Sequence, residues 1–184
     1  MTTPFDEALR PRAPRHPEAP VTAVGRHGQQ TLVAIHGHLR QEMAQVVRAV
    51  TDALADEGRA ADARALINDA SMTVNYRALG SFCGRYCQVV AVHHRIEDQA
   101  MFVDLAGADP ELRPVLDRLS EEHDLIHATL VGLDSALVAM IEQEPGALAR
   151  VTSAVTELQA GLLSHLDYEE AELLGPIGRL GIYI

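Results

Sequence analysis

The sequence has no tryptophan, and aromatic residues make up only 4% of its 184 residues. Apolar residues nevertheless reach 47%, and most of them are alanine, leucine and valine, a composition that suits packed helices better than a β-sheet. A chain of this length is enough for one domain with a sizeable buried core. The scarcity of aromatic side chains therefore favours a single, largely helical domain.

Positive charge, long apolar runs and cysteine are also scarce. The net charge of −11 excludes a basic surface for nucleic acid or anionic lipid. The chain has no run of about 18 apolar residues and no apolar segment of a secretory signal near its start, so we expect a cytoplasmic protein without a membrane span. Cys83 and Cys87 are poorly placed for a mutual disulfide on a helix, and we expect them to be buried, reduced side chains.

The chain divides into a proline-rich arm and a helical body. Five of the nine prolines lie within residues 1–20, and residues 1–28 are predicted to form an extended arm without a core of its own. In residues 29–184, apolar residues recur three and four positions apart, broken by residues 57–71 and by glycine- and proline-containing breaks. The predicted helices span residues 29–56, 72–106, 110–143 and 145–174. Together with a short C-terminal tail, they predict an all-α, antiparallel four-helix bundle.

Histidine and glutamate lie on the apolar faces of these helices. His93 stands four residues before Glu97, a spacing that places both side chains on one helix face. The same spacing recurs further along the chain, and helical phase selects His36 over His38 as the inward histidine of the first helix. The predicted inward-facing donors are His36, His93, Glu97, His123, His127, His165 and Glu169.

Together these seven side chains predict a metal centre. A single histidine on an apolar face is usually a core residue, but five imidazoles and two carboxylates in an apolar interior are costly without a shared partner. A solvated polar cavity is the alternative. The set lacks a thiolate and suits iron, with manganese or zinc as the other choices. Seven donors are too many for one ion and suit two. The Glu-x-x-His pattern of ferritin-like sites is absent.

The order and spacing of these seven residues resemble the hemerythrin-like (HHE cation-binding) domains over about residues 29–176. The resemblance implies a non-haem centre of two iron ions joined by an oxo or hydroxo bridge. Oxygen-carrying members have an aspartate five residues after the last histidine, where this chain has Glu170, and this departure speaks against simple oxygen transport. By analogy, one iron takes His123, His127 and His165, the other takes His36 and His93, and Glu97 and Glu169 bridge them.

Three functions fit such a centre. The first is an enzyme that disproportionates hydrogen peroxide, the second a sensor or store that binds O₂ or NO reversibly, and the third an iron-handling protein without catalysis. The sequence shows no fused output domain for sensing, and reduction of O₂ or NO would need a reductase partner. Peroxide disproportionation needs neither. We therefore expect a di-iron protein that binds O₂ or a related small oxidant.

Other polar residues carry weaker predictions. Tyr86 lies two turns before His93 on the same face, where it either lines the site or, as we favour, packs in the core with its hydroxyl satisfied. Four histidines are predicted to lie at the surface or behind the ligands: His16, His27, His38 and His94. Three carboxylates either orient ligand imidazoles or are solvated: Asp98, Asp167 and Glu170.

Overall fold

The computed structural model describes the backbone of residues 5–62 and 69–184, and the side chains within these ranges except at position 53 and at positions 56–82. All regular secondary structure in the described residues is helical, with no strand among them, and the prediction of an all-α bundle is confirmed. The main elements are α1 (Ala23–Asp62), α2 (Asp69–Ile96), a π-helical turn (Glu97–Met101), α3 (Phe102–Ala108), α4 (Arg113–Ile141) and α5 (Ala147–Leu180).

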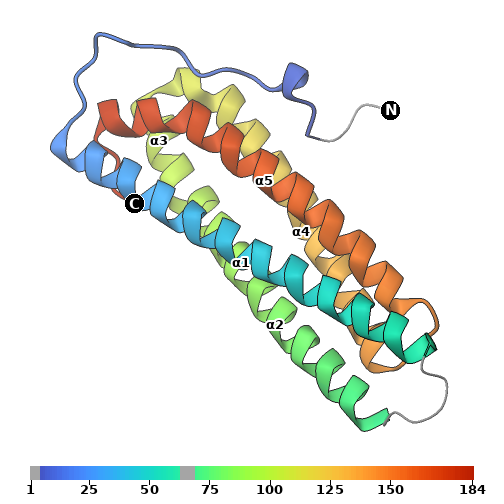
Figure 1. Ribbon diagram of the computed structural model, residues 1–184. Helices are drawn as coiled ribbons and strands as arrows, with labels where there is room; N and C mark the ends of the chain where they lie inside the picture. The colour runs from blue at the N-terminus through green and yellow to red at the C-terminus, as the bar shows by residue number, and fades with distance from the viewer. Residues whose placement is uncertain (1–4, 63–68) are drawn as a thin grey trace.

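The long helices form one elongated bundle (Figure 1). Helix α1 packs on α2 and α5, and α4 also packs on α2 and α5, so that each helix has two neighbours. Helix α2 passes through the π-helical turn directly into α3, which leads over Asp109 and a short 3₁₀ turn (Pro110–Leu112) into α4. Asp109 accepts a hydrogen bond from the backbone N–H of Glu111, as expected of a residue that begins a helical segment.

Two hydrophobic clusters fill the interior, and the predicted polar residues lie between them. On α1, Leu32 belongs to the cluster nearer the N-terminal arm and Leu39 to the other, with His36 between them. On α4, Leu119 and Ile126 likewise belong to different clusters and flank His123. The apolar periodicity of the helices thus builds a core that is interrupted at one level by a polar layer.

The helix ends differ from the predicted ones where packing outweighs local signals. Helix α1 begins at Ala23 rather than at residue 29, and the predicted stop at Gly175-Pro176 is wrong because α5 continues to Leu180. A proline inside a helix costs about 3 kcal/mol, but here the last turns pack closely on α1. A Cβ atom on Gly25 would lie 2.2 Å from the carbonyl oxygen of Gly178, so the helix backbones nearly touch. The predicted connection at residues 57–71 lies partly in α1 and α2, and its residues 63–68 lie outside the described part of the chain.

The N-terminal arm lies against the bundle and runs along α5 (Figure 1). The hydroxyl of Tyr168 donates to the carbonyl of Pro11 at 2.8 Å. The backbone N–H of Ala13 and the guanidinium groups of Arg12 and Arg15 donate to the buried carboxylate of Glu172. Residues 23–28 of the predicted arm belong to α1, and the part before them is held to the bundle by hydrogen bonds and ion pairs.

One helical stretch of the described chain, Pro110–Ile141, is long and apolar enough to cross a membrane by length and composition alone. The core helix of a soluble protein passes the same test. In this bundle, the inward face of the stretch carries buried polar side chains, among them Glu122 and His123.

Candidate metal centre

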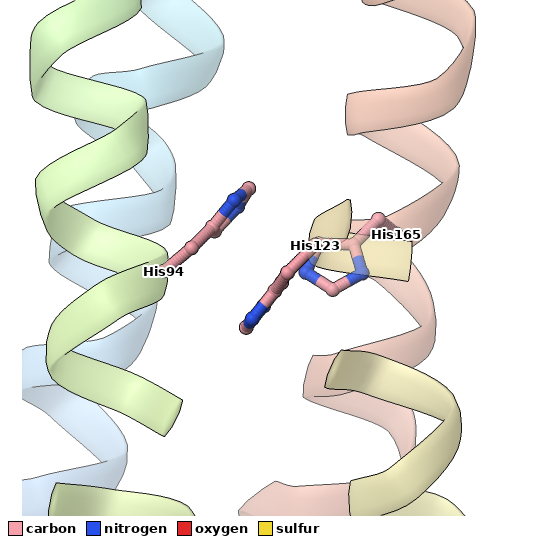
Figure 2. Close-up of side chains that lie close together, drawn as sticks. All are labelled: His94, His123 and His165. Carbon is pink, nitrogen blue, oxygen red and sulfur yellow. The ribbon is translucent and has the colours of Figure 1, made fainter. Parts of the chain in front are cut away.

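Two groups of nitrogen and oxygen donors meet in the polar layer. The first consists of His36, His93, Glu97 and Glu169, and the second of His94, His123 and His165. Within each group the potential ligand atoms lie within 4.8 Å of one another. Figure 2 shows the second group, with His94 reaching from α2 towards the side chains of His123 and His165. The adjacent histidines of α2 thus serve different groups.

The side-chain atoms that point into these groups lack hydrogen-bond partners. In the described part of the chain, nine buried side-chain nitrogen and oxygen atoms have none. They are the Nε2 atoms of five histidines (36, 93, 94, 123 and 165) and both carboxylate oxygens of Glu97 and of Glu169. Buried polar groups in folded proteins are normally paired, so nine unpaired atoms in one layer are an arrangement that a shared cation would satisfy.

The two glutamates connect the groups. Glu97 Oε1 lies 3.1 Å from His93 Nε2, whereas Glu97 Oε2 lies 3.5 Å from His123 Nε2 in the other group. Glu169 Oε2 lies 3.5 Å from His36 Nε2 and 3.7 Å from His165 Nε2. Two ligands about 2.1 Å from a shared ion and at right angles to each other are about 3 Å apart. The spacing therefore suits two neighbouring ions with both carboxylates between them.

Carboxylates behind the cluster orient three of the histidines. The Nδ1 atoms of His36, His123 and His165 lie 2.9, 3.0 and 3.1 Å from oxygens of Glu170, Asp98 and Glu122, in that order. A carboxylate beside Nδ1 keeps the ring proton on that nitrogen and leaves a lone pair on Nε2. Three rings therefore present an unprotonated nitrogen to the cluster, which is the form that binds a metal ion.

Burial sets the protonation of the cluster. It lowers the pKa of His36 and of His93 to about 3, and it lowers the pKa of His94 and His165 well below the ordinary value. These imidazoles are therefore neutral at pH 7, ready to act as ligands. Burial also raises the pKa of Glu169 to about 8, so a bound cation would have to displace a proton from the carboxylate pair.

The chemistry of the donor set fits a metal ion. Neutral imidazole nitrogens and carboxylate oxygens bind iron, manganese and zinc, and the described groups contain no thiolate. Phe102 stacks on the His123 ring with centroids 5.5 Å apart, which closes one side of the cluster with an apolar surface. The arrangement can hold cations and shelter them from bulk water.

The structure brings together six of the seven predicted donors: His36, His93, Glu97, His123, His165 and Glu169. The prediction that His127 faces inward is wrong, because its side chain is exposed on α4. Both Glu122 and His123 are buried, so the middle of the inner face lies between them. At about 100° per residue, His127 then lies about 90° away from that middle. The roles of the six as ligands stay predictions.

Two residues of the site were missed by the sequence reasoning. His94 was expected at the surface or behind the ligands, yet only 5% of it is exposed and its ring stacks on His123 at 4.0 Å. It stands three residues before Glu97, and side chains three apart also share a helix face. Glu122 stands three residues after Leu119 on the apolar stripe of α4. Spacings of three residues, given equal weight with spacings of four, would have found both.

The structure also shows where the residues with weaker predictions lie. The Tyr86 hydroxyl donates to the carbonyl of Leu39 at 3.0 Å, so the favoured interpretation of Tyr86 as a satisfied core residue is confirmed. Asp98 contacts His123 and Glu170 contacts His36, whereas Asp167 accepts from Arg40 instead. The histidines predicted at the surface are exposed, apart from His94: His16, His27 and His38.

Comparison with known proteins gives one match. The family of the hemerythrin HHE cation binding domain matches residues 27–177. No curated protein matches the sequence, and no solved structure does. The matched range contains both groups of the polar layer, all of α2 and α4, and most of α1 and α5.

Proposed function

The chain belongs to the family of hemerythrin HHE cation-binding domains, and on that premise we propose that its bundle core holds two iron ions at which O₂ or a related small oxidant binds. The observation that carries the proposal is the set of nine unpaired buried atoms, which form two groups bridged by Glu97 and Glu169. Iron is favoured because imidazole and carboxylate ligands without thiolate suit it, and two iron ions would supply redox chemistry with small oxidants.

The proposed reaction is the disproportionation of hydrogen peroxide, in which two H₂O₂ give O₂ and two H₂O. One peroxide is oxidised and the other reduced, so the reaction needs no separate electron donor. In it, the residues of the chain hold the ions, keep ligand nitrogens unprotonated through the carboxylates behind them, and limit contact with bulk water.

Reversible binding of O₂ or NO is the second candidate. It is favoured by the protonation and hydrogen bonding of nearby side chains. His36 and His93 are neutral at pH 7, and the Tyr86 hydroxyl already donates its hydrogen bond to a backbone carbonyl. None of these three side chains offers a ready proton to a reacting oxidant. A site with few available protons favours retention of a bound gas over its conversion.

One experiment separates these candidates. Protein loaded anaerobically with Fe²⁺ is analysed for metal, exposed to O₂ with recording of its visible spectrum, and then given hydrogen peroxide in an oxygen-electrode cell. We expect about two iron ions per chain and oxygen evolution that Glu97→Ala abolishes together with iron binding, whereas His127→Ala retains both.

The other outcomes are distinct. A reversible spectral change under O₂ without oxygen evolution from peroxide would replace the enzyme with the sensor or store. Bound iron with neither response would leave an iron-handling protein. One tightly bound zinc ion without any iron uptake would contradict the two-iron centre itself.

A further inference from the structure

The N-terminal arm reaches the metal centre through one buried arginine. Arg10 is only 7% exposed although it lies in the arm. Its guanidinium donates to both oxygens of Glu122, at 2.8 and 2.9 Å, and to the hydroxyl of Ser164 at 3.0 Å. It also lies 4.6 Å from the ring centroid of Tyr168. The paired hydrogen bonds fix the plane of the Glu122 carboxylate as well as its position.

Glu122 passes this constraint to a ligand histidine. Its Oε2 atom, which accepts from Arg10, lies 3.1 Å from Nδ1 of His165. Its Oε1 atom accepts from Arg10 and also from Arg118 on the same helix. Both Glu122 and His165 are fully buried. Removal of Arg10 would take an opposite charge away from the buried Glu122 carboxylate. The carboxylate would then be free to turn away from the histidine.

We propose that Arg10 is a positioning residue for the metal centre. By fixing Glu122 it orients the His165 ring, so that docking of the arm and occupancy of the ion site at His94, His123 and His165 stabilise each other. This inference rests on the cluster binding metal. It does not require the metal to be iron or any oxidant to react there.

The arm also has a second attachment that offers a matched control. Arg12 and Arg15, with 52% and 61% of their side chains exposed, contact Glu172. Glu172 binds arm residues at 2.8 to 3.1 Å, and it is not among the donors that form the two groups in the described chain. Loss of Arg12 should therefore remove part of this second attachment and leave the contacts of Arg10 with Glu122, and through it the support of His165, in place.

The test compares Arg10→Met with Arg12→Met in full-length protein loaded with Co²⁺, whose visible absorption reports its ligands. We expect Arg10→Met to release one of the two ions to a chelator about tenfold faster than wild type, the scale typical of a lost partner behind a metal ligand, and to change the Co²⁺ spectrum. Arg10→Lys should restore part of the effect. Arg12→Met should release both ions at the wild-type rate.

A double variant sharpens this test. If Arg10 acts through Glu122, then Glu122→Gln should resemble Arg10→Met, and the double variant should be little worse than either single variant. Unchanged release from Arg10→Met would overturn the proposal. So would equal acceleration in Arg10→Met and Arg12→Met that follows their melting temperatures, because the arm would then be only a stabilising segment.

A second measurement needs no variant and so avoids the risk of misfolding. Trypsin can cut the exposed arm after Arg12 or Arg15, and α5 after the exposed Arg150 near its start. Because coupling between two sites is reciprocal, metal loading should slow cleavage of the arm several-fold more than cleavage after Arg150. Equal protection at both places would overturn the coupling.

The results for the wild type and the Arg10 variant together also separate this inference from the proposed function. Metal uptake with the expected Arg10 effect, but without a response to O₂ or peroxide, would refute only the proposed oxidant chemistry. Absence of metal uptake would refute both.

Discussion

Replacement of His94 should remove one metal ion from the centre. Its Nε2 atom is one of three imidazole nitrogens in its group, and the side chain is buried against the ring of His123. Changes to partners behind a metal ligand already weaken binding by about 10–100-fold. Loss of a direct ligand should therefore cost at least about 100-fold, or about 2.7 kcal/mol. His94→Ala should thus lower the metal content from about two ions per chain to about one.

The assay is metal analysis after dialysis against a chelator of fixed strength. His127→Ala is the matched control, because it removes the same side chain from an exposed position of α4, and it should keep both ions. His94→Phe tests whether a void explains the loss, since it keeps a ring of similar size beside His123 but has no ligand nitrogen. If His94→Ala kept both ions while His127→Ala lost one, the geometry of α2 and α4 described above would be refuted.

Three further results are expected. Metal loading of the metal-free protein at pH 7 should release at least about one proton, because burial raises the pKa of Glu169 to about 8 and that of Glu97 well above its ordinary value. Calorimetry in two buffers of different ionisation enthalpy measures this proton release, and equal heats of binding in the two buffers would show that no proton is released. The metal-free protein should lose stability as the pH falls from about 4.5 to about 3, where His36, with a pKa of about 3 against 6.5 when unfolded, takes up its proton only on unfolding. Above pH 4.5 the raised pKa of Glu169 opposes this trend. The stability of His36→Gln should therefore fall less steeply with acid below pH 4.5 than that of the wild type. An equal fall in both proteins would contradict the role of His36. Tyr86→Phe should cost about 1 kcal/mol in urea unfolding for the lost hydrogen bond to Leu39 without loss of metal, and a fall in metal content would show that Tyr86 supports the centre.

Periodicity predicted the fold and the level of the site because both depend on local spacing. The choice of His36 over His38 followed from helical phase alone, and the structure buries the first and exposes the second. Phase failed on α4, where His123 lies to one side of the inner face instead of at its middle, and the next turn carries His127 out to solvent. A pattern of apolar residues gives the direction of a helix face only to within about one residue.

Contacts between distant parts of the chain could not be predicted from spacing. Arg10 and Glu122 lie 112 positions apart, and the proline-rich composition of the arm gave no sign that one of its arginines would be buried. The continuation of α5 past Pro176 likewise depends on α1, whose close approach at Gly25 is a property of the assembled bundle. These features follow from tertiary packing and have no local signature.

The π-helical turn Glu97–Met101 contains one residue more than an uninterrupted α-helix would need at this place. Glu97, the first residue of the turn, faces the polar layer, and Phe102, which follows the turn, stacks on His123. Deletion of one residue from the turn would restore α-helical geometry but rotate α3 by about 100°, which would turn Phe102 and Leu105 out of the interior. The number of residues between these side chains therefore determines the centre as much as their identity does. A single-residue deletion in the turn would expose the cluster to solvent, although all of its donor residues would still be present in the chain.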